Sequence, residues 1–447
     1  MTTATPAAVT LAAPATEFCL HDLIRFRACH TPEAPAILAP GRAALSYARL
    51  QAHLDETVAR LNAFGLGRND RVAVALPNGP EMATALLAVS STAICAPLEP
   101  LGSAAHFDSL ITSLGAKTLL IRAGIDSPIL KVAWKRRMKV LELLPGKAEA
   151  GLFKLKGDKV FSPTPRVLAA PGDIALLLRT AGATGRPRLV PLTHRNLCSA
   201  AFNTGSSLQL LEGDRCLNVM PLHKAHGLIA ALCSSLAAGA SVVCAPGVAS
   251  PAFWRWLVEL HPTWYTASPG LQGAILRDAA ENREAILRAP LRFIRSCDAA
   301  LAPKILTALE NVFHAPVIET YGTTETTHQI AASPVSRWLR KPGSVGLASG
   351  PSVAIMGSAG ELLDRGRIGE IVVRGETVMN AYENNPQANE TAFTHGWFRT
   401  GDKGYLDAGN YLFVTGRMRS ACAGSEEKTR SHHTSDLPPL EQMAAGL

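Results

Sequence analysis

The sequence predicts an α/β protein of stacked, parallel-type sheets with helices and a small β-rich subdomain near the end of the chain. Between residues 71 and about 340, short β-rich apolar runs alternate with helical patterns, as in strand–helix–strand units. From about Lys341 the pattern changes to short strands separated by glycines. Apolar residues make up 47% of the 447 residues, which is enough for a sizeable core and too many for a disordered chain.

The first elements follow in order from this pattern. Arg71–Gly79 predicts a strand that ends in a turn, and Pro80–Ala93 predicts a helix with proline at its first position. The runs at 94–100, 117–124 and 173–180 predict the next strands. Units of this kind build parallel sheets, and ligands bind at the carboxyl ends of their strands.

The longest charge-free stretch, residues 227–247, resembles a membrane span by length only. Ser234, Ser235 and Gly239 interrupt it. We expect a buried helix, a glycine stop and a buried strand, and therefore no membrane span.

The later strands are expected in four short segments. KPGSVG, SVAIMG, GEIVVRG and YLFVTGR each combine β-formers with a bounding glycine, and few helical stretches lie between them.

Charge and cysteine usage limit the class of protein. The net charge of +8 comes from 44 basic and 36 acidic residues without a dense basic block, which favours small anionic partners over nucleic acid. The nine cysteines form no C-x-x-C pair, and their number is odd. We expect reduced, mostly buried thiols in a cytoplasmic protein, and neither a disulfide framework nor a zinc site.

Both ends of the chain differ from the rest. Residues 1–17 are rich in alanine and threonine, without a basic segment or long apolar core, and predict a disordered leader rather than a secretory signal. Residues 418–447 are polar and aperiodic and predict an aberrant tail. Within it, we interpret His432–His433 as a solvated pair and not as a metal ligand.

The segment 176–197 has the features of a phosphate-binding loop. A buried strand runs into a loop rich in glycine and hydroxyls, and Arg186 and Arg188 follow. Backbone N–H groups in such turns can approach phosphate oxygens, and cations complete the site. It is not a Walker A loop, because no Lys-Ser/Thr pair follows the glycines. The alternative is a flexible surface connection.

Two further segments place acids after strands. In 317–328 a short strand leads to a hydroxyl-rich turn around Glu325, which could hold Mg²⁺; the alternative is a helix N-cap with the acid as third residue. In 396–417, Asp402 is expected in a glycine turn between strands, where it could accept from both hydroxyls of a ribose. The alternative there is an Asx turn.

Together and in this order, these three segments resemble the adenylate-forming superfamily, which contains acyl-CoA synthetases, peptide-synthetase adenylation domains and beetle luciferases. The resemblance covers about residues 18–419, and LSYARL, NDRVAVALPNGPE and APLEP look like the early blocks of that family. Other segments look most like its oxalate–CoA ligase branch: MPLHKAHGLIAALCSSLAAGA, TWYTASPG, LRFIRSCDAALAP, RKPGSVG and GWFRTGDKGYLD.

The resemblance implies the large N-terminal body of these enzymes, here as α/β subdomains at 18–190 and 191–345 and a β-rich subdomain at 346–417. It also implies a two-step reaction. A carboxylate attacks the α-phosphate of ATP to give acyl-AMP, and the thiol of CoA then displaces AMP. Mg²⁺ would be the cofactor, CoA the co-substrate, and a small dicarboxylate such as oxalate the acid.

The resemblance also implies roles for individual residues. Those expected to bind the triphosphate are Thr180, Gly182, Thr184, Gly185 and Arg188. Those expected to line the adenine and ribose are Asp298, Ala299, Glu319, Thr320, Tyr321, Asp402 and Arg417. Thr324 would contact phosphate, Glu325 would hold Mg²⁺, and His226, Ser296 and His328 would face the acyl substrate. The alternative for both histidines is a hydrogen-bonded structural imidazole.

Four departures from the family pattern lower the expected activity. The phosphate loop has Ala181 and Ala183 in place of hydroxyl residues, and Arg188 in place of lysine. Lys224 stands where many members have histidine, and the hinge at 416–420 lacks its usual Lys-Asp pair. The small C-terminal domain of the family is expected to be absent, as after a frameshift or an alternative exon. We therefore expect impaired catalysis; the alternative is a non-catalytic relic that binds AMP or ATP. The pattern does not predict an oligomeric state.

Overall fold

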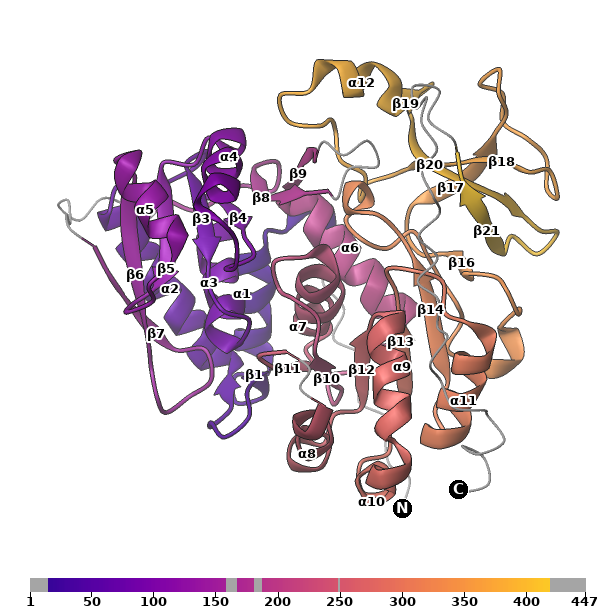
Figure 1. Ribbon diagram of the computed structural model, residues 1–447, viewed down its shortest axis with the longest axis horizontal. Coiled ribbons are helices and arrows are strands. Elements are labelled where there is room, and N and C mark those ends of the chain that lie inside the picture. The colour runs from indigo at the N-terminus through magenta and orange to yellow at the C-terminus, as the bar shows by residue number, and fades with distance from the viewer. Residues whose placement is uncertain (1–14, 158–166, 181–186, 248–249, 419–447) are drawn as a thin grey trace.

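The computed structural model of the protein describes residues 15–157, 167–180, 187–247 and 250–418. Three sheets and the helices around them make up this part of the chain (Figure 1). The predicted leader lies outside the described residues except for 15–17, which form the 3₁₀ turn η1 (Ala15–Glu17). The predicted tail lies outside them except for residue 418, and so does the His432–His433 pair.

The first sheet contains the strand–helix–strand units that the sequence predicts. In order across the sheet its strands are β7 (Phe153–Lys156), β6 (Lys139–Pro145), β5 (Thr118–Arg122), β3 (Arg71–Ala75), β4 (Ile94–Pro97), β8 (Ile174–Arg179) and β9 (Leu189–Thr193). The five inner strands are parallel, and only the edge strands β7 and β9 are antiparallel to their neighbours. The predicted strands at 71–79, 94–100, 117–124 and 173–180 are therefore confirmed.

The second sheet combines distant parts of the chain. Its order is β16 (Leu347–Ala348), β15 (Ala331–Ala332), β14 (Val317–Tyr321), β13 (Phe293–Ser296), β12 (Trp264–Ala267), β10 (Arg215–Asn218), β11 (Ser241–Cys244), β1 (Pro35–Leu38) and β2 (Leu45–Ser46). Strand β1 pairs in parallel with β11, with Ile37 opposite Val242. The sheet is thus completed by a segment that precedes the whole first sheet in sequence.

Helices fill the space between the two sheets and cover their outer faces (Figure 1). One continuous core packs both inner faces against the helices α1 (Leu20–His30), α2 (Tyr47–Ala63), α3 (Pro80–Ser90), α6 (His194–Ser207) and α7 (Ser234–Ala237). The outer face of the first sheet packs on α4 (Ala104–Leu114) and α5 (Pro128–Lys135). The outer face of the second packs on α8 (Ser250–Leu260), α9 (Pro269–Asp278), α10 (Arg283–Arg288) and α11 (Pro303–Phe313). Alternation along the strands explains the division, because Val72 and Val74 face the inner core while Ala73 and Ala75 face the outer one.

The charge-free stretch folds as a buried helix followed by a strand, as predicted. Residues His226–Cys233 form the π-helix η2, which continues into α7. Gly239, at a φ of +78°, ends the helical segment, and the buried strand β11 follows. No helix in the described ranges is both long and apolar enough to cross a membrane.

The third sheet is small and antiparallel and lies at the upper right of Figure 1. It contains β17 (Ser352–Met356), β18 (Gly369–Arg374), β20 (Trp397–Leu406), β19 (Phe393–Thr394) and β21 (Leu412–Arg417), with α12 (Pro386–Ala392) before β19. The expected strand at KPGSVG is wrong. Those residues form a turn before β16, in which Gly343 and Gly346 have φ values of +78° and +96° that a strand does not use.

Candidate functional site

A cleft of about 2060 Å³ opens where strands of the first two sheets end and face the third sheet. Its walls come from the segments that follow β4, β8, β10, β13 and β14, together with β20 and β21. The structure brings together every predicted site residue that it describes: Thr180, Arg188, His226, Ser296, Asp298, Ala299, Glu319, Thr320, Tyr321, Thr324, Glu325, His328, Asp402 and Arg417. Gly182, Thr184 and Gly185, with the substituted Ala181 and Ala183, lie outside the described residues.

One end of the cleft is built around the carboxylate of Asp402. The Tyr321 hydroxyl donates a hydrogen bond to its Oδ2 at 2.7 Å, and the Arg417 Nε lies 3.7 Å from its Oδ1. Asp402 and Arg417 are also direct neighbours across the β20–β21 pair. Burial raises the pKa of Asp402, and the hydrogen bond from Tyr321 opposes that rise only in part.

The expected glycine turn at Asp402 is wrong, because Asp402 lies inside strand β20. The glycines around it serve the sheet instead: a Cβ on Gly404 would lie 2.3 Å from the Phe413 carbonyl oxygen, so close strand pairing requires glycine there. An Asx turn does form, but at Asp407, whose Oδ1 accepts from the backbone N–H groups of Gly409 and Tyr411.

The middle of the cleft joins the base of the predicted phosphate loop to Glu325. The backbone N–H of Thr180 donates to the Arg188 carbonyl at 2.9 Å, and the N–H of Arg188 donates to Thr180 Oγ1 at 3.3 Å, which holds the two ends of the loop together. The Arg188 guanidinium lies over the Tyr382 ring, 4.9 Å from its centroid. The hydroxyl of the same tyrosine donates to Glu325 Oε1 at 2.8 Å.

Glu325 does not cap the helix that contains it. In the 3₁₀ turn η4 (Thr324–Thr326), the N-cap is Thr323 and the third residue of the capping box is Thr326. The alternative interpretation, in which Glu325 is the third residue of a helix N-cap, is therefore wrong. The carboxylate and the nearby threonine hydroxyls are hard oxygen donors that fit Mg²⁺, so the chemistry of this turn is compatible with that ion.

The other end of the cleft contains two stacked imidazoles. The rings of His226 and His328 lie 5.2 Å apart between centroids, at an angle of 25°. His226 Nδ1 is 3.1 Å from Asp298 Oδ1, and its Nε2 is 2.6 Å from Thr266 Oγ1. His328 Nε2 is 2.9 Å from Arg295 Nη2. Both histidines are hydrogen-bonded, as the structural alternative requires, and both also line the cleft.

Burial and charge keep these two rings neutral. The pKa of His328 is held well below its usual value by burial and then by the charge of Arg295. Burial also lowers the pKa of His226, although its hydrogen bond to Asp298 opposes this. Asp298 stays ionised, because the hydrogen bond from His226 and nearby positive charge outweigh the burial that would raise its pKa.

Left-handed backbone conformations gather at this end of the cleft. Asp298 has a φ of +82°, Thr327 of +53° and His328 of +86°, values that cost free energy for residues other than glycine. Such strain is typical of sites where a side chain must be held in a required direction.

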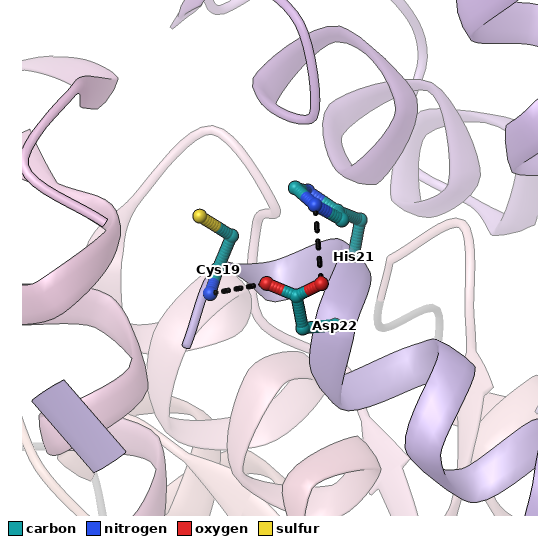
Figure 2. A group of neighbouring side chains, drawn as sticks. All are labelled: Cys19, His21 and Asp22. Carbon is teal, nitrogen blue, oxygen red and sulfur yellow. Dashed lines mark hydrogen bonds and ion pairs between the residues drawn. The ribbon is translucent and has the colours of Figure 1, made fainter. Parts of the chain in front are cut away.

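A separate cluster at the start of α1 has donor atoms that could hold a metal ion. Candidate ligand atoms of Cys19, His21 and Asp22 lie within 4.8 Å of one another (Figure 2). Asp22 Oδ2 accepts from the Cys19 N–H at 3.0 Å, and its Oδ1 lies 3.3 Å from His21 Nε2.

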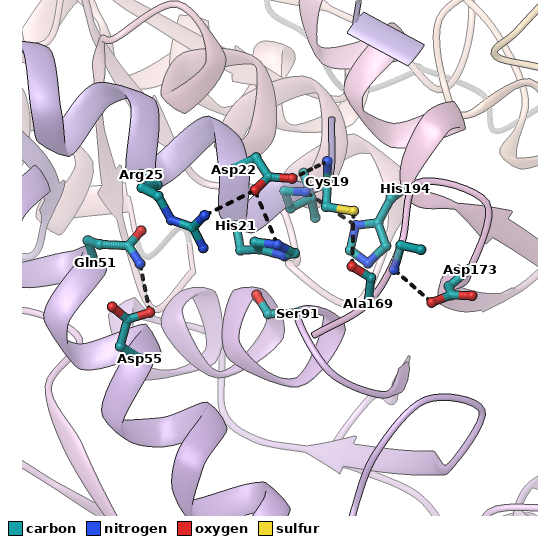
Figure 3. Close-up of polar contacts among 12 residues, drawn as sticks. Cys19, His21, Asp22, Arg25, Gln51, Asp55, Ser91, Ala169, Asp173 and His194 are labelled. Carbon is teal, nitrogen blue, oxygen red and sulfur yellow. Dashed lines mark hydrogen bonds and ion pairs between the residues drawn. The ribbon is translucent and has the colours of Figure 1, made fainter. Parts of the chain in front are cut away.

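The contacts of this cluster are those of a helix start. The Cys19 thiol donates to the Ala169 carbonyl, and burial raises its pKa to about 12, so it is a protonated donor rather than a thiolate ligand. Beside it, the Leu20 N–H donates to His194 Nδ1, and the pKa of His194 is lowered by burial to about 4 (Figure 3). We assign the cluster to the anchoring of α1 on the segment before β8 and on α6.

Sequence reasoning missed three residues of the cleft network: Thr266, Arg295 and Tyr382. Arg295 alone had a signal, since it is a charged residue that directly follows the apolar pair Phe293–Ile294 in the strand run FIRS. Thr266 lies within a buried strand, and Tyr382 lies in a polar loop, so neither stands out.

Comparison with known proteins gives a family match over most of the chain. The family model described as AMP-binding enzyme matches residues 24–383.

Individual relatives and solved structures agree with that match. The chain is 37% identical over 404 residues to an oxalate–CoA ligase of Arabidopsis thaliana, covering 89% of this chain and 78% of the relative. It is 33% identical over 416 residues to a sulfoacetate–CoA ligase of Cupriavidus necator, covering 90% and 78%. The ATP-bound structure of MatB from Rhodopseudomonas palustris superposes with a TM-score of 0.77 at 25% identity, covering 90% of this chain and 79% of that one.

Proposed function

This chain belongs to the AMP-binding enzyme family, and from that premise we propose that it is an acid–CoA ligase that activates a small acid with a second anionic group, such as oxalate, as its acyl-adenylate. The observation that carries the proposal is the division of one cleft into two ends. The end at Asp402 offers a carboxylate that suits ribose hydroxyls, and the end at His226 and His328 is polar and lies against a buried arginine.

In the proposed first step, a carboxylate oxygen of the acid attacks the α-phosphorus of ATP. The new bond is an acid–phosphate anhydride, and pyrophosphate leaves with the electron pair of the broken P–O bond. In the second step the sulfur of CoA attacks the acyl carbon, the thiol proton is released, and AMP leaves. Catalysis of the first step is mainly positioning and charge stabilisation.

The described residues divide these tasks by position along the cleft. Asp402 would accept from the ribose hydroxyls, and Glu319 and Thr320 would lie along the adenine. Arg188, held against Tyr382, would neutralise phosphate charge in place of the usual lysine. Glu325 would hold Mg²⁺, which when bound withdraws charge from the phosphate oxygens. Gly182, Thr184 and Gly185 keep the phosphate-binding role that the resemblance implies for them.

The acyl end favours a short polar acid over a fatty acid. Buried polar groups line it, including the Ser296 hydroxyl, which has no hydrogen-bond partner among the described residues. An alkyl chain there would leave these groups unpaired, at about 1–3 kcal/mol each. The names of two relatives, an oxalate–CoA ligase and a sulfoacetate–CoA ligase, refer to acids with a second anionic group and support this choice.

The test is pyrophosphate release by the full chain with Mg²⁺·ATP and a panel of oxalate, sulfoacetate, acetate and palmitate, with acyl-CoA measured in parallel after addition of CoA. We expect release to be fastest with the two dianionic acids. Faster release with palmitate than with oxalate would overturn the substrate assignment.

Measurements on the same samples distinguish the proposed ligase from the alternative, a non-catalytic nucleotide-binding relic. Titration calorimetry that detects AMP or ATP binding, combined with no pyrophosphate release for any acid, would favour the relic. The losses of hydroxyls at positions 181 and 183 and of the phosphate-loop lysine motivate this alternative and predict weaker ATP binding than a full set of donors would give.

A further inference from the structure

Arg295 is a buried cation that no reaction step has used so far. It is the third residue of β13, its exposed fraction is 0%, and no carboxylate lies within ion-pair distance of it in the described residues. Burial of a guanidinium without a paired anion is costly, so its hydrogen bonds must offset that cost. Its Nε has no partner among the described residues, while its two terminal nitrogens contact three side chains.

The direction of each hydrogen bond follows because a guanidinium can only donate. Arg295 Nη2 donates to His328 Nε2 at 2.9 Å and to Gln329 Oε1 at 3.1 Å. His328 Nε2 is therefore the unprotonated ring nitrogen, and the proton of the neutral ring must be on Nδ1. That Nδ1 has no hydrogen-bond partner in the described part of the chain, and His328 lines the cleft.

The second histidine is fixed by Asp298 and joined to the same guanidinium through one hydroxyl. The Asp298 carboxylate can only accept, so neutral His226 carries its proton on Nδ1 and donates it to Asp298 at 3.1 Å. Its Nε2 then accepts the single hydroxyl proton of Thr266 at 2.6 Å, and Thr266 Oγ1 in turn accepts from Arg295 Nη1 at 3.3 Å. The donor–acceptor pattern thus runs without conflict from Arg295 to Asp298.

We propose that Arg295 is a positioning residue that fixes His328 as the neutral Nδ1–H tautomer, within a network in which Asp298 fixes His226 in the same tautomer, so that His328 offers a permanent N–H donor to the second anionic group of the acid. The charge of Arg295 lies directly behind that donor and strengthens it. The tautomer assignment is independent of any substrate, whereas the contact with the anion rests on the proposed function. The other charged groups near the two rings are Asp298 and, at the mouth of the cleft, the exposed Lys224.

The first experiment needs no substrate. Nitrogen-15 NMR of the histidine-labelled full chain distinguishes the two neutral tautomers from the imidazolium, and His328→Gln and His226→Gln variants identify the signals of the two rings. We expect both rings to remain neutral with the proton on Nδ1 between pH 5.5 and 8. An Nε2–H tautomer for His328, or titration of either ring in this range, would overturn the proposal.

Two substitutions test the hydrogen bonds of this network one at a time. In Thr266→Val, which is nearly isosteric, His226 should keep its proton on Nδ1 through Asp298, but its Nε2 signal should shift because that nitrogen loses its hydrogen bond, while the His328 signal stays unchanged. In Arg295→Gln, His328 should begin to titrate within the same pH range. If Arg295→Gln does not fold, Thr266→Val still decides the matter, because an unchanged His226 signal in that variant contradicts the proposed network.

The contact with the second anion is tested by kinetics of pyrophosphate release. Arg295→Gln should lower kcat/KM for oxalate at least tenfold more than for acetate, and Arg295→Lys, which keeps the charge but not the planar fork, should fall between Gln and the native residue. The control is Arg288→Gln on exposed α10, which should change neither. An equal loss for both acids would contradict the anion contact, and no release with any acid would contradict the proposed function while leaving the NMR result to stand.

Discussion

The two ends of the cleft are built on different physical principles. At the acyl end, hydrogen bonds join the buried Arg295, Thr266 and His226 to Asp298 at the surface of the cleft. The nucleotide end extends to the middle of the cleft, and there Asp402 and Glu325 each receive one tyrosine hydroxyl. The first end is organised before any ligand arrives, while the second keeps acceptor capacity for an incoming nucleotide.

The largest effect is expected from the nucleotide end, in Glu325→Gln. The amide oxygen can still accept from Tyr382, so the fold should be kept, but the charge that would hold Mg²⁺ is lost. We expect pyrophosphate release to fall by about 10²–10³, the usual size of losing one electrostatic contact in a transition state. Glu390→Gln on the exposed face of α12 is the matched control. A loss below tenfold would show that Glu325 does not hold the metal ion.

Asp402→Asn should weaken nucleotide binding without changing stability. Asparagine keeps an acceptor for the Tyr321 hydroxyl but replaces a charged acceptor for the ribose, which costs about 1.5–3 kcal/mol, or about ten- to a hundredfold in affinity. Titration calorimetry with AMP measures this, with exposed Asp364→Asn as control. Unchanged affinity would remove the ribose assignment.

The comparison of the two ends predicts that Thr266→Val at the acyl end, unlike Asp402→Asn, lowers the stability of the protein. The valine leaves Arg295 Nη1 and His226 Nε2 without partners in a buried site, which should lower the free energy of unfolding by about 1–3 kcal/mol. Chemical denaturation of this variant beside Asp402→Asn is the measurement. Equal stability of the two variants would show that the two ends do not differ as described.

The smallest effect is the pH dependence of adenosine binding, a probe without phosphate groups of its own. The pKa of Asp402 is raised by burial, so its carboxylate is protonated at a higher pH than an exposed aspartate, whose pKa is about 3.9. Affinity for adenosine should therefore decrease as the pH falls below neutral, and the decrease should begin at a higher pH than an exposed aspartate would give. In Asp402→Asn this decrease should disappear; if it persists, another group is responsible.

Sequence patterns predicted the strands that precede the site segments and the positions of those segments, but not the network that joins them. The runs at 173–180 and 317–321 form strands because their own apolar residues favour it, and the site residues follow directly after them. The contact of Arg295 with His328 depends instead on which strand end faces which loop. The glycines around Asp402 predict a turn, but glycine also occurs where strands approach closely. The sequence alone does not separate these two uses.

The pairing of Ile37 with Val242 has a consequence for synthesis of the chain. Ribosomes add about 5–20 residues per second, so about 10–40 s pass between the appearance of β1 and that of its partner β11. The first sheet uses no residue before Arg71 and can form within that time, whereas the apolar strand at 35–38 must wait with an unpaired edge. Aggregation of nascent chains, and any dependence on chaperones, should therefore begin at this short N-terminal strand.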